Sequence, residues 1–181
     1  MSFFDRFTKK KDNDIQYHAT AKVLINLACD VDESIRLSKD LLLTEDELSD
    51  FHRHKRDLAC KTVLYSAVIS MEPSKRDKFV DILIEWREKK DALAEAPADV
   101  RKMIVKMNKI ADQAYHDTFT KVTSYIQKSQ ANSDPVALLK GSFSKLFCMF
   151  LEQDNNTEYY EIGENIFSHH HELTVNSVKK L

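Results

Sequence analysis

Histidines and carboxylates are the residues of this sequence whose types and spacing could do chemistry. Three consecutive histidines, His169 to His171, stand in a chain that holds only seven. Consecutive residues of a helix point about 100° apart, so three in a row cannot converge on one metal ion. Only His169 and Glu172 have the spacing of a ligand pair, and the sequence offers no third ligand beside them. His170 falls on an apolar stripe, so we expect a ring at the core boundary that makes one hydrogen bond.

Three aspartates are each followed by a histidine four residues later, a spacing that puts both side chains on one helical face. These pairs are Asp14/His18, Asp50/His54 and Asp112/His116. Each could supply half of a metal site. A metal-dependent hydrolase that pools His18, His54 and His116 with nearby aspartates is therefore one alternative function.

The dipeptide His116-Asp117 is similar to the metal-binding pair of the HD phosphohydrolases, and the resemblance covers these two residues alone. It implies a bound metal with His52 or His54 as the upstream ligand. Antiparallel helices oppose this arrangement, because a rise of about 1.5 Å per residue would separate His18 from His54 by something like 20 Å. We expect solvated helix faces with local charge pairs instead, and no metal or cofactor.

The overall composition argues against several classes of partner. Lys and Arg number 27 against 29 for Asp and Glu, and a formal charge of -2 favours neither nucleic acid nor an anionic membrane. Cys29, Cys60 and Cys148 lack CxxC spacing and lie in apolar neighbourhoods, so we expect reduced core thiols in a cytoplasmic protein. No window of the sequence has the apolar length of a membrane span.

Helical periodicity sets the expected fold, since two Gly and three Pro leave little turn chemistry for hairpins. Steps of three and four between apolar positions predict one helix from Asp14 to Leu43. Five further helices are predicted to begin at Thr44 in a capping box, near Pro73, after Pro97, at Asp134-Pro135 and at Asn155 to Thr157. The segment from Leu58 to Met71 is apolar on nearly every face, which predicts a central helix. The last helix has a candidate break near Ser168.

Short connections between these helices favour antiparallel neighbours. The chain is therefore predicted to be all-α, a single-domain up-and-down antiparallel bundle of about six helices. We expect residues 1-12 to form an amphipathic, basic arm and residues 13-181 to form the bundle.

Alternating helices would bring two acid-rich corners to the same end of the bundle. One corner holds Glu45, Asp46, Glu47 and Asp50, and the other holds Glu152, Asp154, Glu158, Glu161 and Glu164, with no basic residue between the acids of either corner. Acids near helix N-termini are ordinary partners of the helix dipole, so a solvated face is one interpretation. The other is a docking surface for a basic protein.

The N-terminal arm has an apolar arc if it is helical. Phe3, Phe4 and Phe7 would form that arc, backed by Arg6 and three lysines. The arm could dock on its own bundle, remain a tail, enter a partner's groove or touch an anionic membrane weakly. The sequence thus predicts a protein-binding bundle that is not an enzyme, with a metal-dependent hydrolase and a peripheral lipid-binding bundle as alternatives, and it does not predict an oligomeric state.

Overall fold

The computed structural model describes the backbone over residues 3–90, 97–129 and 134–181, and side chains over 14–90, 97–127 and 134–181. Within these ranges the chain is all-α, without strands. The helices are α1 (Phe3–Ala28), α2 (Val31–Ser38), α3 (Glu45–Ser70), α4 (Pro73–Lys90), α5 (Ala98–Ser129), α6 (Pro135–Phe150) and α7 (Thr157–Val178). The predicted fold class, a single-domain antiparallel bundle, is confirmed.

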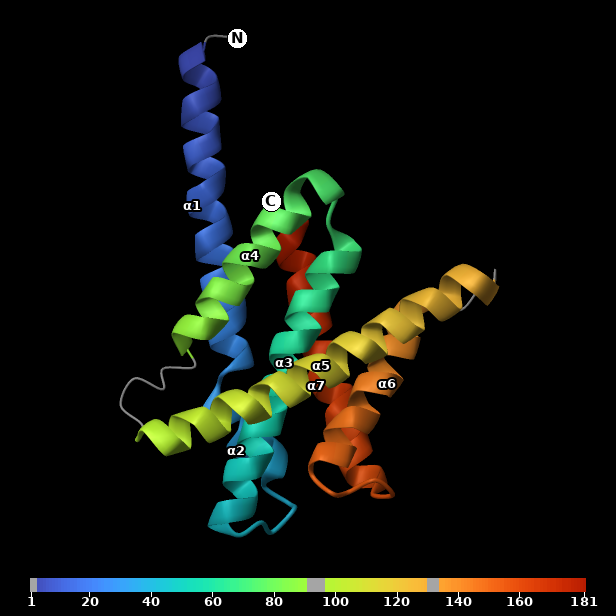
Figure 1. Cartoon of the computed structure of the whole chain (residues 1–181). Helices are drawn as coiled ribbons and strands as arrows, with labels where there is room; N and C mark the ends of the chain where they lie inside the picture. The colour runs from blue at the N-terminus through green and yellow to red at the C-terminus, as the bar shows by residue number, and fades with distance from the viewer. Residues whose placement is uncertain (1–2, 91–96, 130–133) are drawn as a thin grey trace.

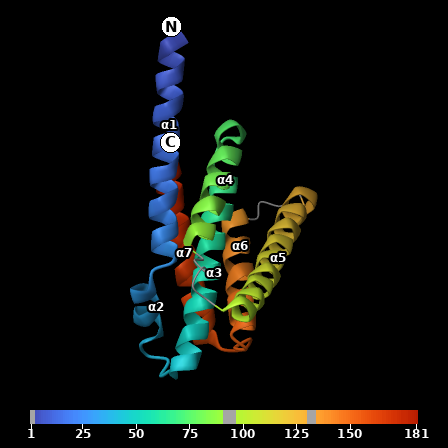
Figure 2. The ribbon, with the colours of Figure 1, turned by 60° about the vertical axis from the view of Figure 1, so that its left-hand side comes forward.

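Successive long helices alternate in direction along the chain, and α3 lies in the middle of the bundle (Figure 1). α1 and α2 descend along one side, α3 returns, and α6 and α7 form a second antiparallel pair, while α5 crosses the bundle obliquely (Figures 1 and 2). α3 packs against every other helix, and Leu58, Ala59 and Val63 in its second half are fully buried. The prediction of a central second helix is therefore confirmed.

The predicted helix starts are confirmed where side chains cap the backbone. The hydroxyl of Thr44 accepts from the backbone N–H of Glu47, whose carboxylate accepts from the backbone N–H of Thr44 at 2.8 Å. Asp134 caps α6, with Pro135 at its first position. Asn156 caps α7 through the N–H of Glu158.

The prediction of one helix from Asp14 to Leu43 is wrong, because the helix is interrupted between the end of α1 at Ala28 and the start of α2 at Val31. The carboxylate of Asp30 accepts from the N–H of Asp32 at 3.1 Å and starts α2. The ammonium of Lys55, on α3, binds the carbonyls of Ala28 and Asp30 on both sides of the break. These contacts satisfy backbone groups that a continuous helix would satisfy itself.

The break also reverses which face of α2 is buried. Val31 and Ile35 continue the apolar spacing that predicted a single helix, yet they are 51% and 52% exposed, whereas Glu33 and Ser34 lie inside. The suggested break near Ser168 is wrong as well, since α7 is continuous. A polar contact across the bundle thus overrode the local hydrophobic pattern in α2.

Candidate functional site at the acidic end

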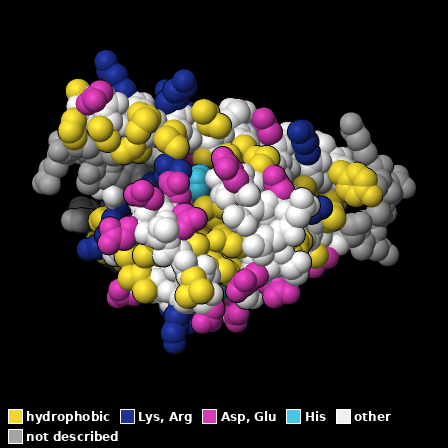
Figure 3. Space-filling model, turned by 90° about the horizontal axis from the view of Figure 1, so that it is seen from below, with side chains coloured by type: hydrophobic (Ala, Val, Ile, Leu, Met, Phe, Trp, Pro, Cys, Tyr) yellow, Lys and Arg dark blue, Asp and Glu magenta, His cyan; other side chains and the backbone are white. Residues whose placement is uncertain are grey.

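The structure brings the two acid-rich corners to one end of the bundle. The turn from α2 to α3 and the turn from α6 to α7 both lie at the lower end in Figure 1. Seen from below, acidic side chains surround apolar areas on this end (Figure 3). The binding residues that the sequence proposed here are all exposed, and they are Glu45, Asp46, Glu47, Asp50, Glu158 and Glu161.

A groove of about 560 Å³ joins the two corners. Its apolar lining includes Phe51 from α3, Met107 from α5, and Phe150 and Tyr159 from the α6 and α7 side. Its acidic lining consists of Glu47, Asp50 and Glu152. The groove is amphipathic, with aromatic surface beside carboxylates that come from segments far apart in the sequence.

Glu152 reaches the groove from a strained backbone position. It ends α6 in a Schellman motif, in which the N–H of Gln153 bonds to the carbonyl of Cys148 and that of Glu152 to Met149. Glu152 occupies the left-handed position of this motif, with φ of 57°. Glycine is favoured there, because a Cβ destabilises the left-handed conformation by about 1 kcal/mol. The chain places a carboxylate on the groove at the expense of some stability.

A basic residue does lie among the acids, which corrects the expectation of an uninterrupted acidic surface. The guanidinium of Arg53 is 3.0 Å from the carboxylate of Asp50 and 3.1 Å from Nε2 of His54. Glu164, further along α7, lies 3.9 Å from the ammonium of Lys140. Among the described residues, Glu45, Asp46, Glu158 and Glu161 form no ion pair. The uncompensated charge is thus concentrated on the first turn of α3 and the first two turns of α7.

His54 forms part of the groove wall and is 8% exposed. Its ring stacks on Phe150, with the centroids 5.3 Å apart. Burial and the neighbouring Arg53 lower the pKa of His54 to about 4, so the ring is neutral near neutral pH. Arg53 can only donate, so Nε2 accepts and the ring proton lies on Nδ1. Nδ1 has no hydrogen-bond partner among the described residues.

The three aspartates of the Asp/His pairs all bind cations from other positions. Asp14 pairs with Lys78, Asp50 with Arg53, and Asp112 with both Lys61 at 2.7 Å and Arg87 at 2.9 Å. Of the paired histidines, His116 lies 3.2 Å from the hydroxyl of Tyr65. Within the described ranges, no group of three or more His, Cys, Asp or Glu could hold a metal ion. The geometry gives no support to the hydrolase alternative.

The three consecutive histidines contact two separate places in the bundle. His171 lies 2.8 Å from the hydroxyl of Ser66, and its ring stacks on Phe167. His169 and His170 both face Glu33, at 4.0 and 3.3 Å. His170 is 1% exposed, deeper than the boundary position expected from the sequence. None of these contacts forms an accessible reactive site.

A buried charge cluster formed by Glu33, Lys55 and His170 links α2, α3 and α7, and sequence reasoning missed it. The ammonium of Lys55 is completely buried and pairs with the carboxylate of Glu33. Burial acts to raise the pKa of Glu33, but hydrogen bonds from His170 and Lys55 and their charges lower it to about 2. Burial lowers the pKa of His170 despite its contact with Glu33. The cluster therefore attaches α2 to α3 and α7 through a buried ion pair and the ring of His170.

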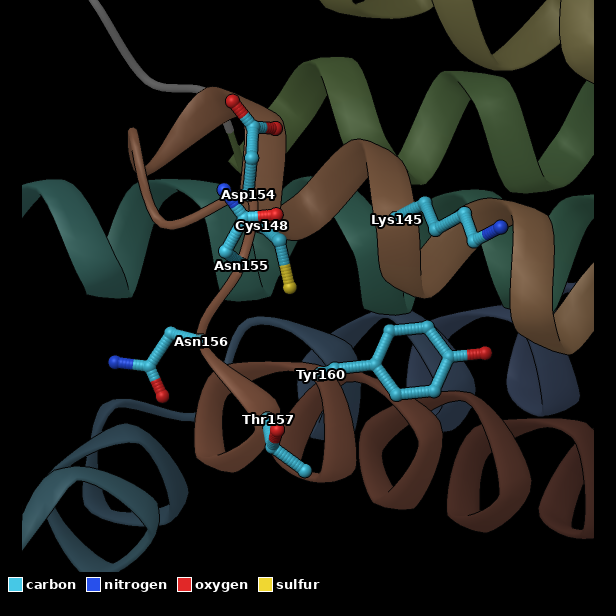
Figure 4. Close-up of a pocket in the computed structure, with 7 residues that line it drawn as sticks. All are labelled: Lys145, Cys148, Asp154, Asn155, Asn156, Thr157 and Tyr160. Carbon is cyan, nitrogen blue, oxygen red and sulfur yellow. The ribbon is translucent and has the colours of Figure 1, made fainter.

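A second recess, of about 330 Å³, lies beside the turn between α6 and α7 (Figure 4). Its lining includes Cys148, Asp154 and Tyr160. The sulfur of Cys148 points into the space between the two helices, whereas the carboxylate of Asp154 points away from the Tyr160 ring (Figure 4). Burial raises the pKa of the Cys148 thiol. The recess gathers no set of convergent charged groups, and the groove remains the better candidate.

The structure describes the predicted N-terminal arm from residue 3 onward, and there only in its backbone. α1 is helical from Phe3 and extends beyond the neighbouring helices (Figure 2). The side chains of Phe3, Phe4 and Phe7 lie outside the described residues. No helix in the described ranges has the length and apolar character needed to cross a bilayer.

Known proteins add no assignment to this geometry. Comparison with protein-family models, with curated proteins and with solved structures finds no match to this chain. A function therefore has to be inferred from the chemistry of the groove.

Proposed function

We propose that this bundle has no chemistry of its own and binds a basic, partly apolar segment of another protein in the groove at its acidic end. The observation that carries the proposal is the meeting of aromatic surface with carboxylates from two separate corners. A segment with lysine or arginine beside an aliphatic or aromatic residue matches both features. Its apolar side chain would lie against Phe150 and the edge of Tyr159, above the buried ring of Phe51, and its cations would lie against the acidic residues.

The distribution of free charge supports a basic ligand. Glu45, Asp46, Glu158 and Glu161 are exposed, and they have no ion pair among the described residues. Carboxylates gathered on one end attract a cationic segment over several ångströms and raise its association rate. Arg53 is already held by Asp50 and His54, so it does not cancel the charge of the outer acids.

The strain at Glu152 supports the same conclusion. Residues in unfavourable backbone conformations cluster at binding sites, where the side chain has a role that offsets the cost in stability. Glu152 adds a carboxylate to the wall of the groove from the position where glycine would be more stable.

A peptide-binding experiment tests the proposal. The probe is a fluorescent peptide of about twelve residues that alternates Lys with Leu or Phe, compared with the same peptide carrying Glu for Lys. We expect the protein to bind the basic peptide at least tenfold more tightly and to lose affinity as salt rises. Replacing Glu45, Glu158 and Glu161 by Lys should weaken binding roughly 10- to 100-fold, from about 0.5–1 kcal/mol per exposed charge.

A matched variant separates local from general charge effects. Replacing Glu72, Asp81 and Glu88 by Lys changes the net charge equally, at exposed positions on α4 and the turn before it, away from both acid-rich corners. This variant should bind the basic peptide like the wild type. Equal weakening in both triple variants, or no preference for the basic peptide, would show that the acidic end is only a solvated face.

A further inference from the structure

Two of the three cysteines lie in contact although they are far apart in the sequence. The sulfur of Cys29, just after the end of α1, is 4.0 Å from the sulfur of Cys60 in the middle of α3. Cys60 is buried and Cys29 is partly exposed. The expected core position thus holds for Cys60 and Cys148, whereas Cys29 packs against the core but is partly exposed.

The backbone around Cys29 is held in a way that keeps the two thiols together. Lys55 donates to the carbonyls of Ala28 and Asp30, the residues on either side of Cys29. Cys29 and Asp30 lie between α1 and α2 and are not helical. A disulfide requires the sulfurs to approach to about 2.05 Å. A non-helical residue can make this movement of about 2 Å by side-chain rotation and a small backbone shift.

We propose that Cys29 and Cys60 are a modification site, a dithiol that hydrogen peroxide converts into a disulfide within the native fold. The sulfur of Cys29 attacks one peroxide oxygen, an S–O bond forms as the O–O bond breaks, and the departing hydroxide takes the thiol proton and leaves as water. The sulfur of Cys60 then attacks the resulting sulfenic acid at Cys29. The S–S bond forms, the S–O bond breaks, and the hydroxyl leaves with the proton of Cys60 as a second water. Two thiols are oxidised, and peroxide is reduced to two waters.

The environment of the two thiols sets the order of these steps. Hydrogen bonding to Cys29 and burial raise the pKa of Cys60 well above its ordinary value, although the charge of Arg87 acts in the opposite direction. Cys60 is therefore protonated and shielded, and Cys29 is the sulfur that peroxide can reach. Cys148 is buried in α6 and has a raised pKa, which makes it a matched control for non-specific oxidation.

The test uses the full chain, reduced and then treated with a few equivalents of hydrogen peroxide. Intact mass should fall by about 2 Da, and peptide mapping should find Cys29 linked to Cys60, a link that dithiothreitol removes. The Cys148→Ser variant should behave like the wild type, whereas Cys29→Ser and Cys60→Ser should not form this link.

Thermal unfolding shows whether the link forms in the native arrangement. The link closes a loop between positions 31 apart, so the oxidised protein should melt roughly 5–15 °C higher than the reduced protein. Four results would overturn the proposal: no loss of mass, oxidation of Cys29 to the sulfinic acid without linkage, a link between chains or to Cys148, or a linked protein that melts lower. The mass measurements on the wild type do not depend on the folding of any variant.

Discussion

Replacing Lys55 by Met tests how α2 is attached to the bundle. The ammonium of Lys55 is completely buried, pairs with the carboxylate of Glu33 and donates to the carbonyls of Ala28 and Asp30 at 3.3 and 3.1 Å. Methionine fills most of the same volume but supplies neither charge nor donor. The carboxylate of Glu33 would keep only the rings of His170 and His169, at 3.3 and 4.0 Å, and burial lowers the pKa of His170.

The pKa of Glu33 gives the expected magnitude. Its fall from an ordinary value of 4.5 to about 2 corresponds to roughly 3 kcal/mol of stabilisation by its partners net of burial. Breaking a buried ion pair by removing one partner costs about 3–5 kcal/mol. We therefore expect Lys55→Met to lower the free energy of unfolding by roughly 3–4 kcal/mol. Because the folded-state pKa of Glu33 is the lower one, its contribution is complete above about pH 4.5 and disappears as the pH falls towards 2.

Urea unfolding followed by circular dichroism measures this loss at about pH 7 and about pH 3. At the lower pH the difference between variant and wild type should shrink, because an unpaired buried Glu33 takes up a proton in the variant. Adding Glu33→Gln to Lys55→Met should recover part of the stability, since the amide still bonds to His170 without a charge. Lys39→Met, at an exposed lysine, should change stability by less than about 0.5 kcal/mol. A loss below about 1 kcal/mol for Lys55→Met, or no recovery in the double variant, would refute this account.

Three glycine-related substitutions probe the α6 and α7 region by the same unfolding measurement. Gly163→Val should destabilise by about 1–3 kcal/mol, because even a Cβ at this position lies 3.1 Å from Cα of Ser144; unchanged stability would mean that the helices separate freely. Gly141→Ala should stabilise by about 0.5–1 kcal/mol, because its Cβ meets only the hydroxyl end of the Tyr160 side chain, at 3.2 Å, and gains helix propensity; a loss would show that this ring cannot move. Glu152→Gly should add about 0.5–1 kcal/mol by relaxing the left-handed residue while weakening basic-peptide binding; equal binding would remove Glu152 from the proposed site.

Local signals predicted most of the fold. The capping box at Thr44 and the cap at Asp134 followed by Pro135 act within a few residues of the helix start that they define. The apolar run in the second half of α3 is also a local signal. It predicted the central position of α3, because only a helix enclosed on most faces can bury apolar residues all around it.

The break after Ala28 could not be predicted in this way, because its cause is a lysine more than twenty residues away that binds two carbonyls. The apolar period continues through Val31 and Ile35, so the pattern alone favours a single helix. The inward position of Glu33 is equally invisible in the sequence, because it depends on Lys55 and His170 arriving from α3 and α7.

The candidate site was predictable in part. Antiparallel order was enough to place both acidic corners at one end, but not to show that Phe51, Phe150 and Tyr159 form a groove between them. The pairing of Arg53 with Asp50 could have been inferred, because the two residues are three apart on one helix. The strain at Glu152 depends on how α6 ends, and no sequence signal marks it.

The inverted burial of α2 has a thermal consequence. The buried residues of α2 are charged or hydroxyl-bearing, Leu37 is its one apolar side chain packed against the core, and Val31 and Ile35 lie in solvent. The helix therefore exposes little new hydrocarbon when it detaches. Exposure of apolar surface is what gives unfolding its large heat capacity increment. Detachment of α2 alone should therefore have a small heat capacity change. The free energy of opening that amide exchange measures over Val31–Ser38 should then vary almost linearly with temperature. The opening free energy in the core of α3 should instead follow the curved stability profile of the whole domain.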